Sequence, residues 1–194
     1  MVIVNHGSLK TETFSLRVFS QADPMVNSTR STRLHPGARS NGHLRDRSSQ
    51  RRRIVLIAST FNKSITRALV RGASDVLRQR GVPPRNMQLL WVPGAFELPV
   101  VAARVAQTRP RPDAIIALGA LIKGDTPQYA VIAHAVASGL AQVSVQTRIP
   151  VTFGVIVATT LAQAKARAGG AEGNRGREAA TAALSVLQVL KRVT

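Results

Sequence analysis

The chain has 194 residues, which is enough for one domain, or for one domain and a tail. It contains no cysteine, so disulfides, thiolate metal ligands and a cysteine nucleophile are excluded. The net charge of +18 invites a nucleic-acid interpretation. However, no zinc pattern, helix-turn-helix pattern or aromatic interleaving accompanies the basic residues, and no apolar run approaches the roughly 20 residues that span a bilayer. We therefore expect a soluble chain with no specific nucleic-acid partner and no membrane partner.

Residues 1–53 show neither helical nor strand periodicity, and they hold ten basic against three acidic residues. We expect them to form a disordered basic Ser/Arg-rich tail, followed by a folded domain at residues 54–194. The acid-poor composition is also typical of an organellar transit peptide. A basic tail, or a start codon set too far upstream, on a bacterial cytoplasmic protein is the interpretation that we favour. The expected location is therefore cytoplasmic, with a plastid or other organelle as the alternative.

From Ile54 onward, continuous apolar runs alternate with helical periodicities. The apolar runs predict buried strands at 54–58, 87–92, 114–118 and 151–157. Helical spacing predicts helices at 62–80, 96–108, 127–147, 161–168 and 177–193, with a loop at 169–176. Apolar strands that alternate with helices predict an α/β fold, in which a parallel four-stranded sheet is covered on both faces.

Ligands of such folds collect at the carboxyl ends of the strands. The segments expected there are 59–62, 93–97, 119–128 and 158–160. Thr126-Pro127 is typical of a helix start, because threonine is a good N-cap and proline is favoured at the first helical position. The free N–H groups of a helix start attract anions. We therefore expect a phosphorylated substrate around residues 118–129, against the alternative of a plain strand–helix connection.

Residues 54–194 give little support for a nucleophilic triad or a metal site. Their one histidine is His134, which lies well inside the long helix and faces away from Gln128, so Ser-His-Asp and Cys-His arrangements are not available. The six acidic residues of this part do not cluster as metal ligands would. We predict no metal site.

Four other side chains are candidates for binding. Phe61 follows the first strand and can either stack on a flat heterocycle or tuck into the core. Glu97 stands at a helix start, where it can recognise a hydroxyl or simply favour the helix dipole. Arg167 and Arg175 flank the glycine-rich loop, and guanidinium groups suit bidentate phosphate contact, although both can also be surface charges.

Six motifs together resemble the lumazine synthase (6,7-dimethyl-8-ribityllumazine synthase) family in order and spacing, from about Arg53 to Val193. They are Ser59-Thr60-Phe61-Asn62, Val92 to Glu97, Ala117 to Pro127, Gly139 to Ser144, Pro150 to Val155, and Arg167-Ala168-Gly169 through Gly173-Asn174-Arg175-Gly176. The resemblance implies a flavodoxin-like three-layer α/β/α sandwich. It also implies the penultimate step of riboflavin biosynthesis, in which 5-amino-6-(D-ribitylamino)uracil condenses with 3,4-dihydroxy-2-butanone 4-phosphate, without a cofactor.

The resemblance further implies a homo-oligomer, either a pentamer or a sixty-subunit shell, with active sites between subunits. Riboflavin synthase is a candidate partner. Residues that would bind the ribitylaminouracil are Phe61, Ala95, Phe96, Glu97, Ala120, Leu121, Ile122 and Phe153. Residues that would bind the butanone phosphate are Asp125, Thr126, Arg167 and Arg175, with Phe153 and Arg167 coming from the adjacent subunit. Glu178 stands where an acid commonly orients the family's catalytic histidine.

The chain departs from the family pattern at Gln128, where the family usually carries the histidine that transfers protons. Glutamine cannot exchange a proton near neutral pH. We therefore expect a slowed synthase in which Gln128 and Arg167 remain the catalytic positions. The alternative is a non-catalytic member that binds lumazine or flavin, or forms a shell. Ala171 replaces a lysine of many members, and Arg175 replaces another. A flavodoxin-like nucleotide-binding module is disfavoured, because the chain has neither a G-x-G-x-x-G turn nor a GK[ST] loop.

Overall fold

The computed structural model describes residues 51–193. Strands and helices alternate along this part of the chain. In order they are β1 (Ile54–Ser59), α1 (Lys63–Gln79), the 3-10 helix η2 (Pro84–Asn86), β2 (Met87–Val92), α2 (Leu98–Ala106), β3 (Ala114–Ile122), α3 (Gln128–Thr147), β4 (Val151–Ala158), α4 (Leu161–Ala166) and α5 (Arg175–Leu190).

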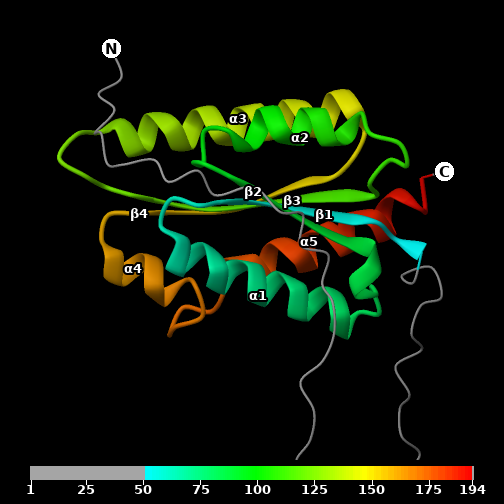
Figure 1. Ribbon diagram of the computed structural model, residues 1–194, viewed down its shortest axis with the longest axis horizontal. Helices are drawn as coiled ribbons and strands as arrows, with labels where there is room; N and C mark the ends of the chain where they lie inside the picture. The colour runs from blue at the N-terminus through cyan, green and yellow to red at the C-terminus, as the bar shows by residue number, and fades with distance from the viewer. Residues whose placement is uncertain (1–50, 194) are drawn as a thin grey trace, which may run out of the picture. The chain divides into compact units, whose positions relative to one another are not determined.

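The four strands form one sheet in the order β2-β1-β3-β4, and every neighbouring pair is parallel. Helices α2 and α3 cover one face, while α1, α4 and α5 cover the other (Figure 1). Alternate residues of β1 serve the two faces: Ile54 and Leu56 pack toward α1 and α5, and Val55 and Ile57 toward α2 and α3. A strand buried on both faces must be apolar throughout, which explains the continuous apolar runs in the sequence. The predicted α/β sandwich with a parallel four-stranded sheet is confirmed.

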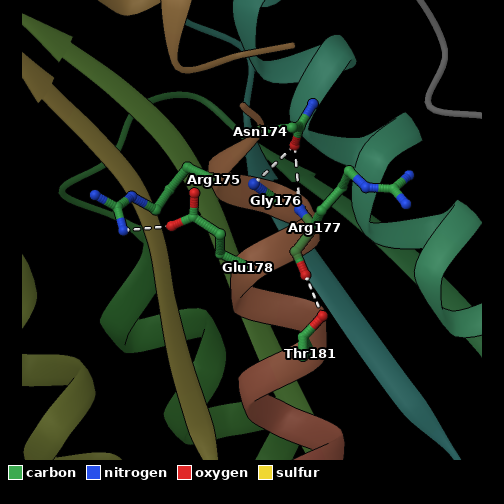
Figure 2. Close-up of polar contacts among 6 residues, drawn as sticks. All are labelled: Asn174, Arg175, Gly176, Arg177, Glu178 and Thr181. Atoms are coloured by element: carbon green, nitrogen blue, oxygen red, sulfur yellow. Dashed lines mark hydrogen bonds and ion pairs between the residues drawn. The ribbon is translucent and has the colours of Figure 1, made fainter. Parts of the chain in front are cut away.

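Helix α5 lies directly against α1 and is fixed there by its first residues. A Cβ atom placed on Gly176 would overlap the Leu69 carbonyl oxygen, so only glycine permits this approach. Asn174 caps the helix, because its Oδ1 accepts hydrogen bonds from the N–H groups of Gly176 and Arg177 at 2.9 and 3.1 Å (Figure 2). Its Nδ2 donates to the Ala68 carbonyl at 3.1 Å, which ties the start of α5 to α1.

Three differences from the predicted boundaries have a physical cause in the fold. Strand β3 continues four residues past the predicted end, since Gly119 to Ile122 pair with Val155 to Ala158 of β4. Helix α5 begins at Arg175 instead of residue 177, because Asn174 caps it there. The predicted cap at Thr126 is wrong: Pro127 occupies the N-cap position of α3, and no side chain caps the helix.

The amino end of β1 is tied to the segment before β3. The Arg53 N–H donates to Asp113 Oδ2 at 2.6 Å, and the Arg53 side chain donates to Gln88 Oε1 at 3.1 Å and to the Pro110 carbonyl. The predicted disordered tail lies outside the described residues, apart from its last three. In the part of the chain that the structure describes, no helix combines the length and apolarity needed to cross a membrane.

Candidate active site

Hydrogen bonds join the four segments expected at the carboxyl edge of the sheet, by which we mean the edge where the strands end. The N–H groups of Thr60 and Phe61 donate to the carbonyls of Val92 and Pro93 at 2.7 and 3.1 Å, which links the ends of β1 and β2. The Lys123 N–H donates to the Ala158 carbonyl at 2.9 Å, which links the ends of β3 and β4. The predicted convergence of these segments is therefore confirmed.

Asn62 also lies at this edge and links it to β3, although the sequence alone suggested no role for it. Its backbone is left-handed, with φ 57° and ψ 42°, and its Nδ2 donates to the Ala120 carbonyl at 3.0 Å. The same residue begins α1, because its carbonyl accepts the N–H groups of Ile65 and Thr66. Asparagine tolerates the left-handed region better than most residues, so an asparagine between a strand and a helix was the available signal.

Aromatic rings are exposed at this edge. The exposed fractions of Phe61 and Phe96 are 69% and 61%, so the alternative of a Phe61 ring tucked into the core is wrong. A ring held on short loops at the end of a sheet presents its face to solvent and can stack on a planar ligand. Ala95 and Ala120 are buried beside these loops, while Leu121 and Ile122 are half-buried. The apolar floor at the carboxyl edge is thus built mainly from β3 and the segment after β2.

Glu97 is held in place by the loop that precedes it. Its Oε2 accepts a hydrogen bond from the Gly94 N–H at 2.7 Å, and among residues 51–193 no donor contacts its Oε1. Glu97 stands at the start of α2, as the sequence predicted, but its side chain makes no capping hydrogen bond to the helix. A half-buried carboxylate with one fixed oxygen and one free oxygen can accept hydrogen bonds from hydroxyl or ring N–H groups of a ligand.

The loop before α3 offers backbone donors. Residues Lys123 to Gln128 are all exposed, and the first turn of α3 has neither a side-chain cap nor an acidic residue. The first N–H groups of a helix have no partner inside the helix, and the helix dipole makes this end positive. Asp125 and Thr126 lie in this loop, immediately before the helix. The arrangement can hold an anion at the carboxyl edge.

The remaining predicted residues, which we call the second group, are Phe153 on β4, Arg167 at the end of α4 and Arg175 at the start of α5. Phe153 is opposite Ala117 in the sheet, five residues and therefore about 16 Å before the end of β4. Arg167 and Arg175 are neighbours, since the Arg175 N–H donates to the Arg167 carbonyl at 2.9 Å. Within residues 51–193, no hydrogen bond or ion pair joins this group to the residues at the carboxyl edge. One chain therefore presents two partial sets.

The two arginines differ in what holds them. Arg175 Nη1 lies 2.6 Å from Glu178 Oε2, and both side chains are partly exposed (Figure 2). The Arg167 guanidinium has no partner among the residues that the structure describes. Glu178 therefore pairs with Arg175 within the chain. Arg167 remains available to an anion.

No group of three or more histidine, aspartate or glutamate side chains that could hold a metal occurs among residues 51–193. His134 is exposed on α3. The candidate chemistry is therefore that of exposed rings, one held carboxylate, backbone N–H groups and arginines. These features define an α/β protein with a parallel sheet, whose carboxyl edge is a candidate site for a planar or anionic ligand.

Comparison with known proteins narrows this class. The chain belongs to the 6,7-dimethyl-8-ribityllumazine synthase family, whose sequence profile matches residues 51–191, so the resemblance noted from the sequence is confirmed. The 6,7-dimethyl-8-ribityllumazine synthase of Gemmatimonas aurantiaca is 49% identical over 141 residues, which cover 73% of this chain and 85% of the relative. Those of Thermus thermophilus and Leuconostoc mesenteroides are 42% and 40% identical over 142 residues, covering 73% of this chain and 90% of each relative.

Proposed function

We propose that this chain condenses 5-amino-6-(D-ribitylamino)uracil with 3,4-dihydroxy-2-butanone 4-phosphate, giving 6,7-dimethyl-8-ribityllumazine, inorganic phosphate and water. Beyond family membership, one observation carries the proposal. A phenylalanine ring that is 69% exposed, a fixed carboxylate and an uncapped helix start share the carboxyl edge of the sheet. Together they match a substrate pair that combines a flat ring, a polyhydroxyl chain and a phosphate.

In this proposal the ring of the uracil stacks on Phe61. Glu97, fixed through Gly94, accepts hydrogen bonds from the ribityl hydroxyls, with Ala95 and Phe96 beside it. Ala120, Leu121 and Ile122 contribute the end of β3 as the opposite wall. Ala95 and Ala120 are buried, so in this proposal they shape the floor beneath the ligand.

The phosphate of the butanone is placed at the start of α3, beside Asp125 and Thr126. Arg167 supplies the compensating charge, and Arg175 supports it from the start of α5. These arginines and Phe153 belong to the second group, which no hydrogen bond or ion pair joins to the carboxyl edge within residues 51–193. We therefore assign them to the site of a neighbouring copy, so that each complete site contains two chains.

The surface of α3 supports an assembly of this kind. Its 20 residues include no aspartate, glutamate, lysine or arginine, and only Val136, Leu140 and Val143 are buried within the chain. Val131 and Val145 are 65% and 79% exposed. A long helix without charge on any side is normally covered all round. We propose that α3 packs against other copies in a pentamer or in a sixty-subunit shell.

Gln128 sets the expected speed of the reaction. It is exposed at the first position of α3, where the family usually carries its proton-transfer histidine. A positioned acid–base group typically contributes about 10²–10⁴-fold to a rate. Holding an amine against a ketone can supply effective molarities of roughly 10⁵ M or more. We therefore propose a slow but real synthase that works by proximity and phosphate neutralisation, with protons carried by water or by the phosphate.

The test is to mix the purified full chain with both substrates and follow lumazine fluorescence. Arg167→Ala should lower kcat/KM by roughly 10–100-fold, because a charge-assisted hydrogen bond contributes about 1.5–3 kcal/mol. Arg177→Ala is the matched control: it removes an exposed arginine ten positions later and should leave kcat/KM unchanged. If no product forms while the ribitylaminouracil still binds, the protein is a binding or shell-forming member and the catalytic proposal is wrong.

A further inference from the structure

The outward face of α1 carries a row of basic side chains. Lys63, Arg67, Arg71 and Arg78 are all exposed, and they fall within an arc of roughly 80° opposite the buried face of the helix. The row is about 22 Å long at 1.5 Å per residue. Its first three members recur every four residues, so neighbouring side chains are about 6 Å apart. We call these four residues the basic ridge.

The basic ridge is not neutralised by the part of the chain that the structure describes. Lys63, Arg67 and Arg71 make no side-chain hydrogen bond or ion pair with any residue from 51 to 193. Arg78 makes one exposed contact with Asp75 at 3.5 Å, which is too long and too exposed to contribute much. Like charges four residues apart on a helix destabilise it slightly. A row of like charges with only this one weak acidic contact among residues 51–193 suits an anionic partner.

The neighbouring surface adds donors of the same kind. Arg177 extends from the first turn of α5 toward α1 (Figure 2), and with Arg80 it lines a hollow between the two helices. Ser64 and Ser74 lie on the outward side of α1 and can donate hydrogen bonds to phosphate oxygens. No aromatic residue occurs in α1. The face is therefore suited to a charged backbone and not to stacked bases or apolar anchors.

We propose that the basic ridge binds the phosphate backbone of a nucleic acid independently of its sequence. The spacing of about 6 Å and the length of about 22 Å suit successive phosphates better than an acidic polypeptide, which binds through apolar anchors as well as charge. Three of the four ridge residues are arginines, whose planar guanidinium matches a phosphate. The net charge of +18 draws polyanions toward the protein from a distance. The ridge lies outside the proposed catalytic set.

The experiment measures how binding of a fluorescent 20-base-pair DNA duplex to the full chain depends on salt. Each neutralised phosphate contributes a slope of about −0.9 to the plot of log K against log salt concentration. The triple variant Arg67→Ala/Arg71→Ala/Arg78→Ala should therefore reduce the slope by about 2.7 and weaken binding at low salt. The variant Arg67→Lys/Arg71→Lys/Arg78→Lys should keep most of the slope, because it keeps the charges.

The matched control is Arg85→Ala/Arg104→Ala/Arg192→Ala, which removes three exposed arginines outside α1 and changes the net charge equally. It should keep the slope of the unmodified chain. Equal losses in the two alanine triples would overturn the proposal, since net charge alone would then explain binding. Equal or tighter ridge-dependent binding of poly-glutamate would also overturn it, in favour of an acidic protein. Lumazine formation by the ridge variant reports that it folds and should be unchanged.

Discussion

Helices α1 and α3 cover opposite faces of one sheet, but the residues that they turn outward are of different kinds. Helix α1 has four basic residues and one acidic residue in 17 positions, and α3 has no residue of these kinds in 20. Both helices bury one side against the same strands. The difference shows that the sheet fixes only the inward side of a helix. The outward side reflects what the helix meets next, which we propose is other copies for α3 and phosphate for α1.

The largest effect should come from charging α3. Val131→Asp/Val145→Asp would place two carboxylates in the proposed contact between copies, where an unpaired charge is strongly unfavourable. We expect the apparent dissociation constant of the assembly to rise by at least about 100-fold in sedimentation experiments. Ser185→Asp on α5 is the control and should leave the assembly intact. An unchanged assembly in the double variant would mean that α3 faces solvent.

Next in size should be a change at the contact between α1 and α5. Gly176→Ala would drive a Cβ atom into the Leu69 carbonyl, and backbone cannot give way easily, so we expect a loss of about 3 kcal/mol in unfolding free energy. Gly139→Ala on α3 would meet the Pro99 side chain at 2.9 Å, with an expected loss of about 1 kcal/mol.

Gly124→Ala is the control for both substitutions in urea unfolding. Apart from its chain neighbours, no atom of residues 51–193 lies within 4 Å of its added Cβ, so we expect a change within about 1 kcal/mol. If Gly139→Ala destabilised the protein more than Gly176→Ala, the contact between α3 and α2 would be more rigid than the contact between α5 and α1, contrary to this expectation.

A smaller effect is expected at the first residue of α3. Gln128→His should raise turnover roughly 10-fold, which is less than the about 10²–10⁴-fold of a positioned acid–base group, because no hydrogen bond from residues 51–193 holds the exposed side chain at this position. It should also add an inflection near pH 6.5, the usual pKa of imidazole. Gln142→His introduces the same group at an exposed position farther along α3 and should change neither turnover nor its pH dependence. Turnover that stays constant in Gln128→His would show that the position does not transfer protons in this protein.

The smallest effect should come from the ion pair on α5. Glu178→Gln removes the partner of Arg175, but both side chains are largely solvated, at 38% exposure for Arg175 and 49% for Glu178. Such pairs contribute about 0–1 kcal/mol, so we expect a change below about 0.5 kcal/mol in thermal unfolding. Asp75→Asn, which breaks the weaker pair on α1, should change stability still less. A loss above about 1 kcal/mol in Glu178→Gln would mean that the pair is buried in the assembly.

The strands could be predicted from the sequence because each buried strand is a continuous apolar run. Residues 87–92 were predicted with the bounds that β2 has in the structure. Strand β3 was cut short, since Gly119 looks like a stop signal, and only its partner β4 shows that pairing continues to Ile122. The start of α5 was missed by two residues, because Gly176 looks like part of the glycine-rich loop and only the close approach of α1 explains a glycine inside the helix.

The candidate site, like the fold, could be predicted only in part from the sequence. Strand ends in a parallel sheet must meet at one edge, which pointed to Phe61 and Glu97. The chemistry of guanidinium groups pointed to Arg167 and Arg175, and the family resemblance pointed to Gln128. It left open whether Phe61 is buried and whether Glu97 caps a helix. The structure decided both, since the ring is exposed and the carboxylate accepts the Gly94 N–H.

The sequence by itself therefore determined the class of fold, the family and the departure at Gln128, because these depend on local patterns and on motif spacing. Only the tertiary structure decided which side chains act together. It left the Phe61 ring exposed, fixed Glu97 through the Gly94 N–H and paired Arg175 with Glu178. Distances between residues far apart in the chain depend on how layers pack, and no local pattern records that packing.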